Sequence, residues 1–89
     1  MLFICIYTYK PEQRDVILKR RAEGLFTPEG AKRHGQWLSV SGGRVFTLVE
    51  AEDALVITKL VHAWSDLGEF DIYPVVDTEE ALASFVTLR

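Results

Sequence analysis

Hydrophobic and polar positions along this chain follow two periods, which predict four strands and three helices. Residues 2–9, LFICIYTY, place apolar or aromatic side chains on both faces of an expected strand, which is typical of a central strand covered on both faces. Residues 33–40 begin polar and end apolar, which favours an edge strand. Residues 45–50 form a third strand, and residues 69–76 alternate but contain Pro74, which favours another edge.

Three further segments predict helices. Pro11 suits the first turn of a helix that Gly24 ends, and Asp53 is expected to cap a second helix that runs to about Gly68. The third helix covers about residues 77–88. The first two helices each carry an apolar stripe that is expected to face a core: Ile17, Leu18, Ala22 and Leu25 in the first, and Ile57, Leu60, Val61, Trp64 and Leu67 in the second.

The order of these elements predicts an α+β fold of the ferredoxin-like type, β-α-β-β-α-β with a C-terminal helix. Its antiparallel four-stranded sheet has strands one and three in the middle and strands two and four at the edges. Gly42 and Gly43 suit a tight type I′ turn between strands two and three. We expect one domain over residues 1–89, since the chain is short enough for a single core.

Alternation along the strands divides their side chains between two faces. One set is expected to pack under the helices: Leu2, Ile4, Ile6, Leu38, Val40, Phe46, Leu48, Phe70 and Ile72. The opposite set mixes aromatic, polar and charged residues: Phe3, Cys5, Tyr7, Tyr9, Arg33, Trp37, Ser39, Val45, Thr47, Val49, Glu69, Asp71, Tyr73 and Val75. Only the terminal helix is left to cover this second face.

Three interpretations of the second face compete. It could bind RNA, but Phe46 is the only aromatic residue of strand three and the net charge of -3 lacks a basic footprint, so nucleic acid is not expected as a partner. It could be the dry interface of a homodimer. It could also leave a cavity for a small-molecule ligand, either between sheet and helices or between two sheets, lined by Tyr7, Trp37, Thr47 and Tyr73. The sequence does not separate the last two.

Composition narrows the setting. The chain is 48% hydrophobic and 26% charged, as in folded globular domains. Its basic residues concentrate in the first half of the chain and its acidic residues in the second. When the two halves pack into one domain, or two subunits associate, these opposite charges are expected to neutralise one another. With one cysteine, no leader and no apolar run of bilayer length, we expect a cytoplasmic protein with no membrane segment.

An ordered set of short motifs carries a resemblance to a known family: YKPEQRD at 9–15, PEG at 28–30, GQW at 35–37, GGRVFTLVEAED at 42–53, WSDL at 64–67 and PVVDTEEA at 74–81. Over nearly its whole length the chain resembles the DUF3303 family of uncharacterised bacterial proteins. The resemblance implies a dimeric α+β barrel, a homodimer in which two ferredoxin-like sheets face one another through the sides opposite their helices. It implies no established activity.

One position departs from the family pattern, in which a histidine commonly follows the strand-two tryptophan. Here Leu38 follows Trp37, so any chemistry of that histidine is lost or passes to His34. His34 could act as a general base or ligate haem iron, although a histidine near the start of an edge strand is more often solvated. Tyr7 is the other residue that could handle a proton.

The remaining reactive groups predict no metal site and no cofactor. Two histidines and one cysteine, widely separated, match no zinc spacing, and Cys5 in mid-strand is expected to be an inert thiol. Asp66 is expected to tie the end of the second helix to a neighbouring segment. Three functions stay open: a small-ligand-binding protein, a cofactor-free monooxygenase- or isomerase-like enzyme of the dimeric α+β barrel class, and a purely structural or regulatory dimer.

Overall fold

The computed structural model describes residues 1–24 and 26–87. It contains a four-stranded antiparallel sheet in the order β2-β3-β1-β4, which confirms the predicted ferredoxin-like arrangement. The elements follow the chain as β1 (Leu2–Thr8), the 3-10 turn η1 (Pro11–Gln13), α1 (Arg14–Glu23), β2 (Ala31–Leu38), β3 (Arg44–Ala51), α2 (Ala54–Trp64), β4 (Glu69–Val75) and α3 (Thr78–Thr87).

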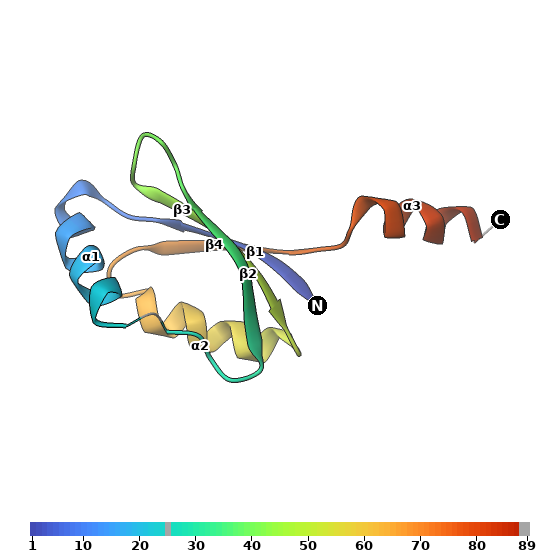
Figure 1. Cartoon of the computed structure of the whole chain (residues 1–89), viewed down its shortest axis with the longest axis horizontal. Coiled ribbons are helices and arrows are strands. Elements are labelled where there is room, and N and C mark those ends of the chain that lie inside the picture. The colour runs from blue at the N-terminus through green and yellow to red at the C-terminus, as the bar shows by residue number, and fades with distance from the viewer. Residues whose placement is uncertain (25, 88–89) are drawn as a thin grey trace.

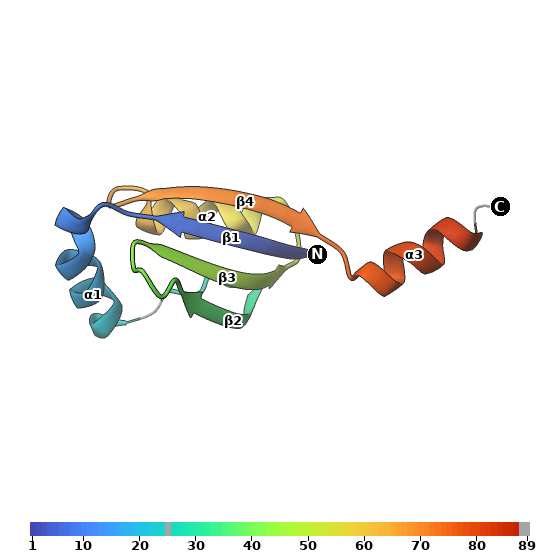
Figure 2. The same cartoon turned by 90° about the horizontal axis from the view of Figure 1, so that it is seen from above.

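The two helices α1 and α2 meet the sheet differently (Figures 1 and 2). Helix α2 runs beneath β1 and β4, whereas α1 stands at one end of the sheet. Asp53 caps α2 as predicted, because its Oδ1 accepts a hydrogen bond from the backbone N of Val56 at 3.2 Å. Val49 and Ala51 of β3 also belong to the core cluster that contains Val56 and Ile57 of α2, so α2 packs against β3 as well.

The predicted faces of β1 and β3 are reversed in the structure. Phe3, Cys5 and Tyr7 are buried toward the helices, where Phe3 and Cys5 belong to the same core cluster as Val56 and Ile57 of α2. Every position of β1 before its last residue, Thr8, is apolar or aromatic, so its pattern could not tell the two faces apart. On β4 the prediction is correct, since Phe70 and Ile72 pack against the core.

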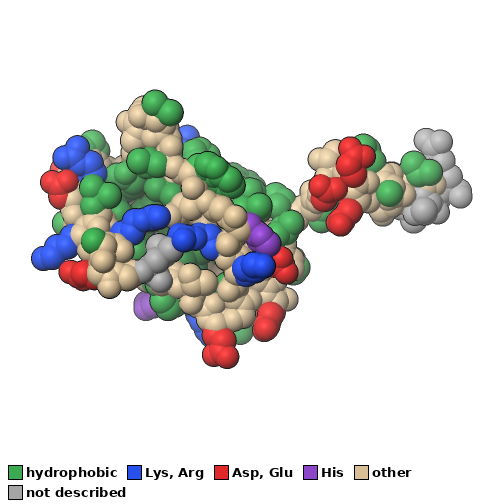
Figure 3. Space-filling view, in the orientation of Figure 1, with side chains coloured by type: hydrophobic (Ala, Val, Ile, Leu, Met, Phe, Trp, Pro, Cys, Tyr) green, Lys and Arg blue, Asp and Glu red, His purple; other side chains and the backbone are tan. Residues whose placement is uncertain are grey.

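The side of the sheet opposite the helices is here called the open face. Its side chains are neighbours across adjacent strands. Ile6 is paired with Phe46 and Phe46 with Trp37, while Ile4 is paired with Leu48 and Tyr73. Figure 3 shows hydrophobic side chains along this side of the molecule. The apolar residues of the open face are Leu2, Ile4, Ile6, Trp37, Phe46, Leu48, Tyr73 and Val75, and the same pairing places Asp71 opposite Ile6 and Glu50 opposite Leu2 on this face.

Strand β2 lies two residues earlier than predicted, and its register with β3 shifts between Arg33 and Gly35. Val40 therefore falls in the loop and is fully exposed, not in the core. The hairpin closes at the Ser39 N to Arg44 O hydrogen bond of 2.9 Å, so the loop is longer than the predicted two-residue turn.

The stripe predicted on α1 is wrong in part, because Ile17 is buried while Leu18 and Ala22 are exposed. A helix at the end of a sheet touches it along a narrow line, which explains why one residue suffices. Leu25 lies outside the described residues. The stripe on α2 is confirmed, with Ile57 buried and the others half-buried.

Helix α3 extends past the end of the sheet and does not cover the open face (Figures 1 and 2). Its apolar side chains Leu82, Phe85 and Val86 are exposed. None of the helices in the described part of the chain has the length and apolar content needed to cross a membrane.

Candidate functional site

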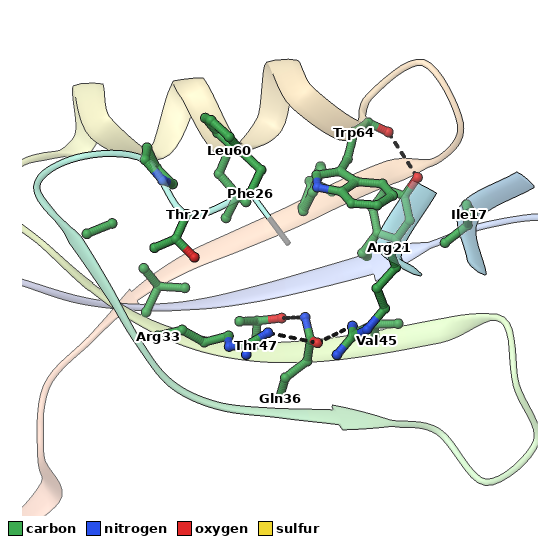
Figure 4. A pocket seen from close by; sticks show the side chains of 15 residues that line it. Ile17, Arg21, Phe26, Thr27, Arg33, Gln36, Val45, Thr47, Leu60 and Trp64 are labelled. Atoms are coloured by element: carbon green, nitrogen blue, oxygen red, sulfur yellow. Dashed lines mark hydrogen bonds between the residues drawn. The ribbon is translucent and has the colours of Figure 1, made fainter. Parts of the chain in front are cut away.

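A cavity of about 80 Å³ lies between the sheet and the helical layer (Figure 4). Its floor is the inner side of β1, β2 and β3, and its walls come from α1, α2, the start of β4 and the segment after α1. This space is several times what one water molecule needs, about 10–15 Å³. The lining residues are Tyr7, Ile17, Arg21, Phe26, Thr27, Pro28, Ala31, Arg33, Gln36, Val45, Thr47, Val49, Leu60, Trp64 and Phe70.

One wall of the cavity is aromatic. The ring of Tyr7 lies 4.7 Å from that of Phe70 and 6.2 Å from that of Trp64, centroid to centroid. The contact with Trp64 is edge-on, an arrangement that aromatic quadrupoles favour. Neighbouring strands β1 and β4 place Tyr7 opposite Phe70, and the last residue of α2 supplies Trp64. The wall therefore depends on three elements.

The Tyr7 hydroxyl is committed to the backbone. It donates a hydrogen bond to the carbonyl oxygen of Trp64 at 2.9 Å. Burial, and then the nearby charge of Asp66, raises the pKa of Tyr7 to about 12. The phenol is thus protonated at neutral pH and ties β1 to the end of α2.

The facing side of the cavity is polar. Gln36 on β2 donates from Nε2 to the Thr47 hydroxyl at 3.0 Å. Its Oε1 accepts hydrogen bonds from Nη1 of Arg21 and, at 3.3 Å, from Nη1 of Arg33 (Figure 4). Two guanidinium groups, one from α1 and one from β2, therefore converge on one amide oxygen.

A separate contact fixes α1 against the end of α2. Arg20 donates to both carboxylate oxygens of Asp66, at 2.9 and 2.8 Å, and to the Ala63 carbonyl at 3.1 Å. Its guanidinium also lies 5.3 Å from the ring centroid of Trp64. The hydrogen bond from Arg20 lowers the pKa of Asp66. The structural role predicted for Asp66 is confirmed.

The four residues predicted to line a ligand cavity do not come together. Tyr7 and Thr47 line the cavity, whereas Trp37 and Tyr73 belong to the open face, 57% and 55% exposed. Trp37 folds back over Gly35: a Cβ at that glycine would lie 2.6 Å from the indole Cη2. The tryptophan of the GQW motif thus belongs to the surface opposite the cavity.

Sequence reasoning missed the cavity residues Arg21, Gln36, Trp64 and Phe70. Arg21 near the end of α1 suits the helix dipole, and Trp64 and Phe70 suit a core, so nothing in their spacing marked them. The one sequence feature that could have pointed to the cavity was Arg33, a charged residue in the alternating pattern of an edge strand. The bulge beside it explains why Arg33 and Trp37 lie on opposite faces.

The proton-handling candidate His34 lies away from the cavity lining. Its Nε2 lies 2.8 Å from Oε1 of Glu50 at the exposed edge, and this hydrogen bond lowers the pKa of Glu50. Leu38, the residue after Trp37, is 62% exposed and also outside the lining.

The thiol of Cys5 is buried in the core, and burial raises its pKa to about 11, as for an inert thiol. Over residues 1–24 and 26–87, no three histidine, cysteine, aspartate or glutamate side chains come together as a metal site would require.

Comparison with known proteins supports the fold. The family model described as a domain of unknown function, DUF3303, matches residues 1–88. Among solved structures, the chain is similar to a Deinococcus radiodurans protein described as a candidate antibiotic biosynthesis monooxygenase, with a TM-score of 0.50 and 8% identity, over 86% of this chain and 93% of that one. None of the curated proteins compared with the chain matches it.

Proposed function

The chain belongs to the DUF3303 family, a domain of unknown function, and we propose that it is a homodimeric protein that binds a small, partly aromatic ligand in the cavity between sheet and helices. The observation that carries the proposal is the cavity itself, in which the aromatic wall of Tyr7, Trp64 and Phe70 faces a few polar groups. Apolar walls with a small number of placed polar groups are what small-molecule sites use.

Binding is favoured over proton-transfer chemistry by the residues that line the cavity. The described lining residues offer no carboxylate, imidazole or thiol as a general base, and the Tyr7 hydroxyl is held by the Trp64 carbonyl. A monooxygenase- or isomerase-like reaction therefore has only the fold in its favour, and a fold of this kind hosts many functions.

A cavity-filling variant tests the ligand site. Val45 lines the cavity, so Val45→Phe would fill part of it, whereas Leu48→Phe adds bulk to the open face of the same strand. Phenol, indole and benzoate serve as probes, and their binding is measured by isothermal titration calorimetry and by the shift in thermal unfolding. We expect at least one probe to bind the wild type and Leu48→Phe, and to bind Val45→Phe at least about tenfold more weakly. Equal binding to all three proteins, or to none, would contradict the site.

The homodimer is supported by the open face. Eight apolar or aromatic side chains from four strands form most of this face, Asp71 and Glu50 lie toward its edges, and no element of the described chain covers it. Exposed apolar patches of this kind mark interaction sites, and a second copy can cover the whole face by twofold symmetry. Beyond the end of the sheet, helix α3 carries the exposed side chains Leu82, Phe85 and Val86.

A charge placed on the open face tests the dimer. Leu48→Glu puts a carboxylate in the centre of the face, whereas Val40→Glu puts one in the exposed hairpin loop. Light scattering during size exclusion should show a dimer for the wild type and Val40→Glu and a monomer for Leu48→Glu, because an unpaired charge in an apolar interface is costly. A monomeric wild type, or a dimer unaffected by Leu48→Glu, would overturn this part of the proposal.

A further inference from the structure

The polar side of the cavity has an unbalanced charge. Arg21 and Arg33 both donate to Gln36 Oε1, and that oxygen belongs to a neutral amide. Among the described residues no carboxylate lies within 4.0 Å of either guanidinium, since the ion pairs found there involve other groups. Two positive charges therefore meet at the mouth of an apolar cavity without a counter-charge.

The neighbouring Arg20, in contrast, pairs its positive charge with a carboxylate of the same chain. It meets both oxygens of Asp66, a carbonyl and the face of Trp64. Arg20 and Arg21 are adjacent on α1, yet only Arg20 has an acidic partner. Arg21 is exposed, so it can take an anionic partner from outside the chain.

A carboxylate fits this vacant role by its chemistry. It carries a full negative charge on two oxygens, so each oxygen can accept from one guanidinium, and such charge-assisted hydrogen bonds are stronger than those to a neutral amide. The amide of Gln36 can rotate, so that its Nε2 donates to the anion in place of Thr47. Figure 4 shows Arg21 and Arg33 reaching Gln36 from opposite sides, with the indole of Trp64 above.

We propose that the ligand of this cavity is a small aromatic carboxylic acid, whose ring lies against the aromatic wall and whose carboxylate is bound by Arg21, Arg33 and Gln36. The inference rests on the proposed function, because it names the chemical class of ligand for the same cavity. It assigns specificity to the two arginines and affinity for the ring to Tyr7, Trp64 and Phe70.

Benzoate and benzamide provide the first test, since they match in size and differ in charge. For the wild type we expect benzoate to bind at least about tenfold more tightly than benzamide. Arg33→Gln should reduce this preference by weakening benzoate binding, and it should leave benzamide binding unchanged. Lys32→Gln, a matched loss of one charge from the same exposed strand, should keep the preference, because Lys32 does not line the cavity.

Gln36→Glu provides a second test that needs no ligand. The new carboxylate would lie between the two guanidinium groups, and the Thr47 hydroxyl can donate to it in place of accepting. We expect a higher melting temperature than the wild type near neutral pH and a loss of benzoate binding, because the chain now supplies its own anion. The two guanidinium groups should lower the pKa of the new carboxyl, so the gain should disappear as the pH falls below about 4.

The outcomes separate the two proposals. Equal binding of benzoate and benzamide to the wild type would overturn the proposal that the ligand is a carboxylic acid, and would leave the cavity as a site for uncharged aromatic rings. Binding of neither probe would overturn both. A Gln36→Glu protein that melts below the wild type near neutral pH would show that the arginines are not short of a counter-charge, and would overturn the inference whatever the probes do.

Discussion

Tyr7 joins three parts of the molecule at the level of a single residue. Its ring packs between Phe70 and Trp64, and its hydroxyl holds the last carbonyl of α2. The same side chain is therefore part of the core and part of the cavity wall. A residue with both roles couples the shape of the cavity to the stability of the fold.

Tyr7→Phe should leave the ring in place and the Trp64 carbonyl without its donor. We expect a loss of about 1 kcal/mol in the free energy of unfolding, the usual net value of one such hydrogen bond. Urea unfolding measures it, with Tyr9→Phe as the control because Tyr9 is only half-buried and no hydrogen bond of its hydroxyl is seen in the described residues. A Tyr7→Phe protein as stable as the control would show that the hydrogen bond contributes nothing.

The ion pair of the single residue Asp66 predicts how the stability of the protein depends on pH. Its pKa is lower in the folded chain than in the unfolded chain because Arg20 binds the ionised form. The stabilisation is therefore complete above the unfolded pKa of about 3.9 and is lost as the pH falls through the folded pKa. Asp66→Asn should melt below the wild type at about pH 7, and the gap between the two melting temperatures should close as the pH falls below about 3.9.

Glu12→Gln is the control for this experiment, because Glu12 is exposed in η1, outside the open face, and forms no ion pair seen in the described residues. Its melting temperature should follow that of the wild type across the same range. A gap between Asp66→Asn and the wild type that stays constant as the pH falls well below about 3.9 would contradict the ion pair as the source of the difference.

At the scale of elements, the close approach of β4 to β1 depends on Gly68. A Cβ there would lie 2.6 Å from the Thr8 carbonyl oxygen and 2.6 Å from Cζ of Tyr7. The backbone at this point cannot move without separating the two strands. Gly68 thus sets where the aromatic wall begins.

Gly68→Ala should destabilise the protein by about 1–3 kcal/mol, as overpacking does, and should weaken ligand binding by displacing Tyr7. Gly35→Ala is the comparison, since the atoms nearest to its Cβ belong to the side chain of Trp37 and not to the backbone. Chemical unfolding of both variants measures the difference. Equal stability of the two variants would contradict the close approach at Gly68.

The elements also show what the pattern of residues could and could not predict. Strand β4 alternates, so Phe70 and Tyr73 could be assigned to their faces from sequence, and the order of strands followed from the order of elements. In β1 both faces are apolar, because one covers the core and the other forms the open face, so period two carried no information on which was which.

The candidate site was predictable only in part for a related reason. Tyr7 and Thr47 fell on one face by register, and they do line the cavity. Trp37 was placed with them by counting along β2, but the shift between Arg33 and Gly35 changes the count. A bulge depends on pairing with the neighbouring strand, which a single strand's sequence does not contain.

At the scale of the whole molecule, one sheet separates two different surfaces. The side toward the helices holds the core and the cavity, and the open face holds the proposed dimer interface. Helix α3 reaches beyond the sheet with its apolar side chains exposed. A second copy that covers the open face lies within reach of this helix, so α3 is expected to strengthen the dimer.

Replacing Leu82 and Phe85 together with serine tests the contribution of α3. Both side chains are exposed within one chain, 51% and 61%, so the fold of that chain should not depend on them. We expect the dimer to dissociate at least about tenfold more readily in sedimentation experiments, with an unchanged circular dichroism spectrum. Unchanged association would show that α3 lies outside the interface.

The central claim is that the ligand binds between sheet and helices and not between two sheets, and the two tryptophans of the chain test it directly. Trp64 lines the cavity and Trp37 lies on the open face, so Trp37→Phe and Trp64→Phe each leave one fluorescent reporter on a known side. Titration with benzoate should change the emission of the Trp37→Phe protein, which reports from Trp64, and leave that of the Trp64→Phe protein unchanged. A saturable change seen only from Trp37 would place the ligand between the sheets and contradict the account.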